Sequence, residues 1–102
     1  MTNIRCSNDR EEYTIDIDGH AGYNPGNDIV CAGVSILGFT LLNAIENQIT
    51  DVCEITMIDG DIHIRVKGTV NSQQDIRTIV ETIMFGYELL EDQYPANISV
   101  EW

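Results

Sequence analysis

The hydrophobic residues of this chain repeat with a period of two in some segments and with steps of three and four in another. Residues 13–18 and 61–67 alternate strictly between apolar and polar side chains, which is typical of half-buried β-strands. One later segment carries an apolar stripe at steps of three and four: Ile76, Ile79, Val80, Ile83, Met84, Tyr87, Leu90 and Tyr94. The stripe predicts an amphipathic helix, which Asn71 or Ser72 caps and Pro95 ends.

A second helix is predicted from Ile29 to about Asn47, and it is apolar nearly all round. We expect such a helix to be buried on most sides, and a second subunit could bury part of its surface. Short strands are expected at "NIRCS", "VCEITMIDG" and "NISVEW", with a turn at "NDREE" and a hairpin at Asp59-Gly60. The predicted order is ββαββαβ. It indicates an α+β fold, a single layered domain over residues 1–102 with two helices packed on a mainly antiparallel or mixed sheet.

Acidic residues dominate the charge of the chain. There are 17 Asp and Glu against 5 Lys and Arg, for a net charge of -12. Such a field repels phosphate backbones and attracts basic polypeptides, so we expect no nucleic acid partner. The alternative is that the charge serves only solubility.

The three cysteines are far apart, and the N-terminus has no apolar signal core. Neither a disulfide framework nor paired zinc-ligand spacing is visible. The longest apolar run, 29–49, is interrupted by several polar side chains, which disfavours a membrane span. We therefore expect a reduced, cytoplasmic protein with no metal, no cofactor and no membrane partner. Cys6 and Cys53 fall in predicted strands and are expected in the core.

The stretch "DGHAGYNPGNDIVCAGVS" joins the second predicted strand to the first helix. If Asp28 or Asn27 caps the helix, Cys31 lies in its first turn, beside unpaired amides and the positive end of the helix dipole. That environment favours the nucleophilic thiolate. The loop is short enough to fold His20 back toward Cys31, where an imidazolium would pair with the thiolate. The helix-start amides would then hold the oxyanion of a tetrahedral intermediate.

Other interpretations of these residues remain open. The plainest is a buried helical cysteine and a loop histidine without a role. A metal site formed by His20, Asp28, Cys31 and His63 lacks tight ligand spacing. An anion site at "GYNPGND" is disfavoured by the surrounding negative charge and by the lack of a P-loop lysine. His63 itself is expected to be a solvated residue on the outer face of a strand.

The segments "GHAGY" and "GNDIVCAGVS" closely resemble the ribosomal-processing cysteine protease family, Prp, also called YsxB-like. Further resemblance lies in "LLNAIE", "HIRV" and "YPANISVEW", so it covers nearly the whole chain. The resemblance implies a homodimeric endopeptidase with Cys31 as nucleophile and His20 as general base and acid. Asp28 and Ser35 match the other characteristic polar positions of the motif.

The family resemblance also implies a function. Members remove an N-terminal extension from the large-subunit ribosomal protein L-twenty-seven, and some relatives process phage capsid or scaffold proteins. The loop is mobile in this family, and Gly19, Gly22 and Gly26 supply the freedom that such movement needs. The loop from His20 to Asp28 is one residue shorter here than is typical of the family and contains Pro25.

We therefore expect a cysteine endopeptidase that acts through an acyl-enzyme on the extension of protein L-twenty-seven. One alternative is a phage capsid or scaffold-processing protease of the same family. Another is a non-catalytic acidic module that binds a basic ribosomal protein.

Overall fold

The computed structural model describes residues 1–48, 53–58 and 61–102. Its elements in chain order are β1 (Thr2–Asp9), β2 (Glu12–Asp18), α1 (Ile29–Gln48), β3 (Cys53–Ile58), β4 (Asp61–Lys67), α2 (Gln73–Gln93) and β5 (Ile98–Glu101). The predicted α+β fold and the order ββαββαβ are confirmed. The predicted turn at Asp59-Gly60 lies outside the described residues.

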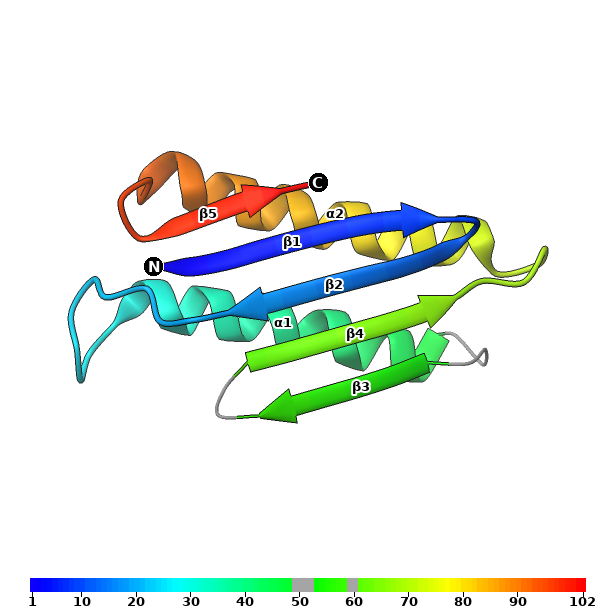
Figure 1. Cartoon of the computed structure of the whole chain (residues 1–102), viewed down its shortest axis with the longest axis horizontal. Coiled ribbons are helices and arrows are strands. Elements are labelled where there is room, and N and C mark those ends of the chain that lie inside the picture. The colour runs from blue at the N-terminus through cyan, green and yellow to red at the C-terminus, as the bar shows by residue number, and fades with distance from the viewer. Residues whose placement is uncertain (49–52, 59–60) are drawn as a thin grey trace.

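All five strands form one sheet in the order β3-β4-β2-β1-β5. Neighbours pair antiparallel, except that β1 and β5 run parallel, so the sheet is mixed. Figure 1 shows that the last strand lies beside the first, at the upper edge of the sheet. The parallel pairing therefore brings the segment after α2 close to the N-terminus and to the end of β2.

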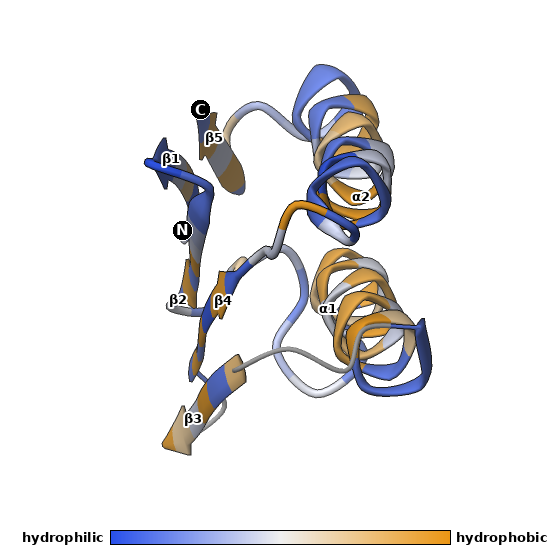
Figure 2. Cartoon of the chain, turned by 90° about the vertical axis from the view of Figure 1, so that its right-hand side faces the viewer, coloured by the Kyte–Doolittle hydropathy of each residue, from blue (hydrophilic) through white to orange (hydrophobic). Residues whose placement is uncertain are grey.

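Both helices cover one face of the sheet and leave the other face open, as the view along the layers shows (Figure 2). The alternation of apolar and polar residues along the strands explains this arrangement. The apolar members of β2 and β4 are buried, with Ile15, Ile64 and Val66 at most 1% exposed. Their polar neighbours, including His63, lie on the open face, so one sheet face supplies half of the core.

The predicted stripe of α2 is confirmed. Ile76, Val80, Met84 and Tyr87 are all fully buried in it. Ser72 occupies the N-cap position of α2 without a side-chain capping bond to the helix. The α2 helix ends at Gln93, and Tyr94, the residue before Pro95, is its C-cap.

The expectation that α1 is buried on most sides is wrong for the single chain. Its inner side is buried, but Ile29, Ile36 and Phe39 remain 58%, 64% and 49% exposed. By length and composition α1 also qualifies as a membrane-spanning helix, despite the polar residues that argued against it. In the fold it packs beside α2 as a core helix does, with Gly33 against Leu90 and Leu37 against Gly86.

Candidate active site

The loop of residues 19–28 leads from the end of β2 to the start of α1, at the left end of the molecule in Figure 1. It begins with Gly19, whose φ of +91° lies in the left-handed region that favours glycine. The Gly19 amide donates a hydrogen bond to Asp61 Oδ1 at 2.9 Å. A Cβ at Gly19 would lie 2.5 Å from the Met1 carbonyl oxygen. The backbone just before His20 is therefore fixed by β4 and by the N-terminus.

Asp28 is the N-cap of α1, as one of the two sequence-based choices predicts. Its Oδ1 accepts hydrogen bonds from the Val30 and Cys31 amides, each at 3.0 Å. Its Oδ2 accepts hydrogen bonds from the Tyr23 and Asn24 amides at 2.9 and 3.3 Å. One carboxylate thus joins the loop to the helix.

These bonds also set the charge state of Asp28. They lower its pKa, and the bond from the Cys31 amide is the largest cause. They change one expectation as well, because the Val30 and Cys31 amides are occupied by Asp28. In this conformation those two amides are not free to hold an oxyanion.

Cys31 lies in the first turn of α1 with its side chain partly buried. Its Sγ accepts a hydrogen bond from the Ala21 amide at 3.3 Å. Ala21 follows His20 directly, so the N–H in question belongs to the peptide bond between His20 and Ala21. The fold therefore brings the loop backbone at His20 onto the Cys31 sulfur.

The His20 side chain is exposed. Among the residues that the structure describes, no hydrogen bond joins the His20 ring to Cys31. The backbone contact at Ala21 thus brings the two residues to one site, while their side chains are not joined by a hydrogen bond. Catalytic hydrogen bonds often form only when substrate binds, so this geometry leaves His20 eligible as the base.

Ser35 lies one turn after Cys31 on α1, and its side chain is exposed. Within the described part of the chain, its hydroxyl makes no hydrogen bond, neither to Cys31 nor to a helix carbonyl. Gly22 and Gly26 have φ values of +68° and +94°, and both are exposed in the loop. The three glycines of the loop all use the left-handed region, which favours glycine over other residues.

Two site residues were missed by the sequence analysis. The Asn97 side chain donates a hydrogen bond from Nδ2 to the Ala21 carbonyl at 2.9 Å. The Tyr94 ring packs edge-on against Tyr23, with ring centroids 5.2 Å apart. Both lie just before β5, more than 70 residues from their partners Tyr23 and Ala21. The sequence analysis placed Tyr94 in an apolar stripe and both residues in a segment of family resemblance, but neither signal linked them to the loop.

The other two thiols differ from Cys31 in their surroundings. Cys6 and Cys53 pack against the hydrophobic core from β1 and β3, as predicted. Burial raises the pKa of Cys6 to about 11. Burial also raises the pKa of Cys53, and Glu46 and Glu54 add to the effect. Neither thiol is prepared to be a nucleophile near neutral pH.

His63 is paired rather than simply solvated. It lies on the open sheet face, with Nδ1 2.7 Å from Asp16 Oδ1 and Nε2 3.2 Å from Asp18 Oδ1. The hydrogen bond to Asp16 is the main cause that raises the His63 pKa. In the described ranges, no group of three His, Cys, Asp or Glu side chains is arranged to hold a metal ion.

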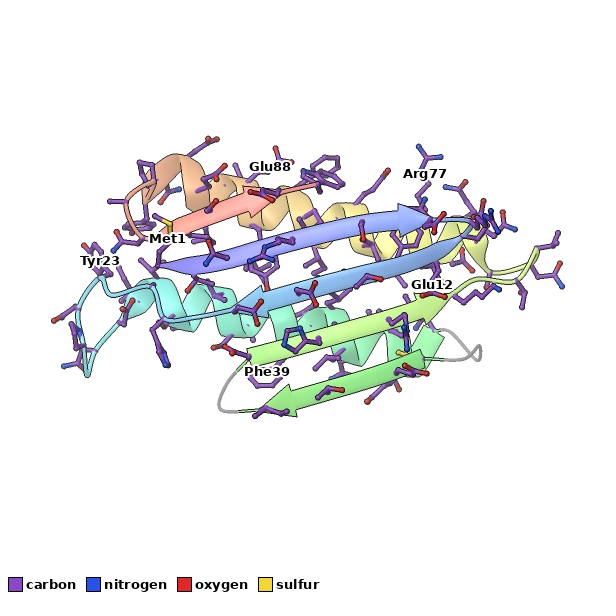
Figure 3. The ribbon with its side chains drawn as sticks, in the orientation of Figure 1. Met1, Glu12, Tyr23, Phe39, Arg77 and Glu88 are labelled. Atoms are coloured by element: carbon purple, nitrogen blue, oxygen red, sulfur yellow. The ribbon has the colours of Figure 1, made fainter. Side chains whose placement is uncertain are left out.

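A cavity of about 510 Å³ is lined by Tyr13, Arg77 and Trp102 among others. Figure 3 labels the loop residue Tyr23 at the left end of the molecule and Arg77 above its right half. Neither Cys31 nor His20 lines this cavity, so the Cys31 site is separate from it.

Comparison with known proteins gives concordant results. The family model of the cysteine protease Prp matches residues 1–99. The ribosomal processing cysteine protease Prp of Staphylococcus aureus is 29% identical over 97 residues, which cover 93% of this chain and 92% of the relative.

Two crystal structures of the S. aureus ribosomal processing protease Prp share this fold. One holds a covalently linked product peptide; it has a TM-score of 0.85 and 31% identity, and the match covers 99% of this chain and 98% of that one. The other holds a substrate peptide; it has a TM-score of 0.77 and 25% identity, and the match covers both chains fully.

Proposed function

This chain belongs to the family of the cysteine protease Prp, and we propose that it removes the N-terminal extension of the large-subunit ribosomal protein L-twenty-seven. Cys31 is the proposed nucleophile and His20 the proposed general base and acid. The observation that carries the proposal is the contact of the Ala21 amide with Cys31 Sγ at 3.3 Å. It fixes the backbone next to His20 against the sulfur at the start of α1.

The proposed reaction has two stages. The Cys31 thiolate attacks the scissile carbonyl, and the tetrahedral intermediate collapses as protonated His20 gives its proton to the leaving amine. The acyl group is then a thioester on Cys31. Neutral His20 next takes a proton from water as the water attacks the thioester, and collapse releases the new carboxylic acid and the Cys31 thiolate, so the starting thiolate and protonated His20 are restored.

Loop movement is part of this proposal. The exposed His20 ring must turn toward Cys31 when substrate binds, and Gly22, close to it in the loop, provides the backbone freedom. Asp28 keeps the start of α1 in place during this movement, since its carboxylate bonds the Cys31 amide. We therefore assign Asp28 a supporting role, and we assign Ser35 only the position on the same helix.

Charge supports a basic substrate. The net charge of -12 attracts a basic polypeptide at long range and raises its local concentration. The name of the S. aureus relative specifies ribosomal processing. A ribosomal protein with an N-terminal extension agrees with both observations, in a cytoplasmic setting.

A homodimer is part of the proposed function. The outer side of α1 exposes Ile29, Ile36 and Phe39, and the neighbouring α2 exposes Leu89 at 63%. Figure 2 shows apolar residues along the outer side of α1 as well as its inner side. A second copy that packs there would provide the cover that the single chain does not.

The deciding experiment is a cleavage assay. Purified protein is mixed with the extended form of protein L-twenty-seven from the same source, and the products are identified by mass spectrometry. We expect one defined cut that disappears in Cys31→Ala and His20→Ala and persists in the control Cys6→Ala. Cleavage by Cys31→Ala would refute the proposed nucleophile. No cut by a wild type whose Cys31 is still reactive would refute this substrate and favour the phage alternative.

A further inference from the structure

The Asn97 side chain connects the turn between α2 and β5 to the loop that carries His20. Its Nδ2 donates to the Ala21 carbonyl at 2.9 Å across 76 residues of sequence. The direction of this bond follows from chemistry, because only the amide N–H side of Asn97 can face a carbonyl oxygen. Asn97 thus holds the Ala21 carbonyl from outside the loop.

Asn97 is itself held by the framework of the fold. Its amide donates to the Tyr94 carbonyl at 2.9 Å, and its carbonyl accepts from the Thr2 amide at 2.9 Å. Thr2 is 1% exposed at the start of β1. The bonds attach Asn97 to the end of α2 and to the sheet, so its side chain reaches the loop from a fixed position.

Ala21 is restrained at both of its peptide bonds. Its carbonyl accepts from Asn97, its amide donates to Cys31 Sγ at 3.3 Å, and its side chain is 2% exposed. The carbonyl and the amide of Ala21 belong to two different peptide planes, which meet at the φ and ψ bonds of Ala21. The bond from Asn97 holds one plane and the buried Cβ lies between the two, so Asn97 restrains the direction of the Ala21 N–H.

A second contact comes from the same turn. The Tyr94 ring meets the Tyr23 ring at an interplanar angle of 76°. Tyr94 and Asn97, which we call the clasp, hold Tyr23 and Ala21 on either side of Gly22. Gly22, between the two held points, has a φ of +68°.

We propose that Asn97 is a positioning residue for Cys31: it holds the Ala21 carbonyl so that the Ala21 N–H stabilises the Cys31 thiolate. The inference rests on the proposed function in that Cys31 is the nucleophile. A donor aimed at the charged form of a group favours that form. The Val30 and Cys31 amides are bonded to Asp28 instead. Among the described residues, Ala21 is thus the one whose amide donates a hydrogen bond to the Cys31 sulfur.

The test measures the reactivity of Cys31 and needs no peptide substrate. Cys31 is alkylated with iodoacetamide between pH 5 and 10, and labelling is followed at each cysteine by mass spectrometry. Asn97→Asp keeps the shape of the side chain but removes the N–H and places a negative oxygen against the Ala21 carbonyl. We expect Cys31 in this variant to react about tenfold more slowly near pH 7, with its rate profile displaced to higher pH. At the alkaline end the two rates should converge.

Two further variants complete the design. Asn97→Ala removes the donor without adding charge, and its backbone bonds remain available, so it is expected to fold and to show the same displacement. Asn71→Asp makes the same charge change at an exposed position before α2 and is expected to leave the profile unchanged. A role in stability alone would lower the melting temperature of both Asn97 variants without moving the pH profile.

The outcomes separate this inference from the proposed function. Folded Asn97 variants with the wild-type profile would overturn the positioning role while selective wild-type labelling of Cys31 keeps the protease proposal. Wild-type labelling of Cys31 no faster than that of Cys6 and Cys53 would remove the proposed nucleophile, and the role of Asn97 with it. A displaced profile in both Asn97 variants, with Asn71→Asp unaffected, supports the inference.

Discussion

The carboxylate of Asp28 accepts a hydrogen bond from the backbone amide of Cys31 at 3.0 Å. The other oxygen of the same carboxylate bonds the Tyr23 and Asn24 amides. The residue that starts the helix therefore also determines the course of the loop. Because all these donors favour the carboxylate over the acid, Asp28 links the shape of the site to its own ionisation.

A pH-dependent loss of stability is expected for Asp28→Asn. The folded-state pKa of Asp28 lies below its ordinary value of 3.8, with the Cys31 amide as the largest cause. The contribution of Asp28 to the stability of the fold is therefore present above pH 3.8 and is lost as pH falls through the folded-state pKa. The variant should melt below the wild type at pH 7, and the difference should vanish in acid. Thermal melts from pH 2.5 to 7 test this, with the exposed Asp92→Asn as control; a constant difference would contradict the assignment.

The opposite pH dependence is expected at His63. Asp16 and Asp18 raise its pKa above the ordinary value of 6.5, the Asp16 hydrogen bond most strongly. The contribution of this pairing is fully present below 6.5 and is lost as pH rises through the folded pKa. His63→Gln should therefore cost most stability near pH 5.5 and least near pH 9, as melts at both values would show. Titration of the His63 ring by NMR with a midpoint at or below 6.5 would contradict this prediction.

Thiol alkylation should be selective for Cys31 in the folded wild type. The pKa of Cys6 is raised to about 11, and that of Cys53 is also raised, so both remain thiols near neutral pH. The Cys31 sulfur lies beside the exposed loop and accepts an amide N–H. We expect Cys31 to label about tenfold faster or more at pH 7.5. Denatured protein, in which all three cysteines should label alike, is the control, and equal rates in the native protein would contradict the prediction.

Gly19 tolerates no larger residue. A Cβ there would lie 2.5 Å from the Met1 carbonyl oxygen, and a φ of +91° is itself strained for alanine. We expect Gly19→Ala to lose about 1–3 kcal/mol of unfolding free energy and to lose cleavage, because His20 is displaced. Gly22→Ala is the matched control: its φ is also positive, but its Cβ meets open space. Denaturant melts should rank the two variants in that order, and equal losses would contradict the steric cause.

The Tyr87 hydroxyl joins the two helices. It is fully buried and donates to the Val34 carbonyl at 2.9 Å, and burial raises its pKa. Tyr87→Phe should lower the unfolding free energy by about 1 kcal/mol with little change in cleavage, since Val34 lies on the inner side of α1. Tyr13→Phe, buried without a comparable bond among the described contacts, is the control. No difference between the two variants in denaturant melts would contradict a structural role for the bond.

Local patterns determined the elements and the core of this protein. Alternation placed Ile62, Ile64 and Val66 inside the sheet, and steps of three and four placed the apolar stripe of α2. These predictions succeeded because strand and helix periods are set by the backbone, so nearby residues alone reveal which face is buried. The same holds for Asp28, because capping is a contact between residues two and three positions apart. The motif that carries both Cys31 and His20 is likewise contained in one short segment, but among the described residues no contact of the His20 ring tests its predicted pairing with Cys31.

Only the tertiary structure decided how that segment is held. The parallel pairing of β5 with β1 brings Asn97 and Tyr94 to the loop, and Asp61 reaches Gly19 from β4. The tertiary structure also leaves the outer side of α1 exposed, where the sequence predicted burial. Contacts between segments so far apart depend on strand order and on how the layers stack, and no period in the sequence encodes these. The proposed reactive residues of the site thus lie in one stretch of sequence, while contacts from β4 and from the segment before β5 hold that stretch in place.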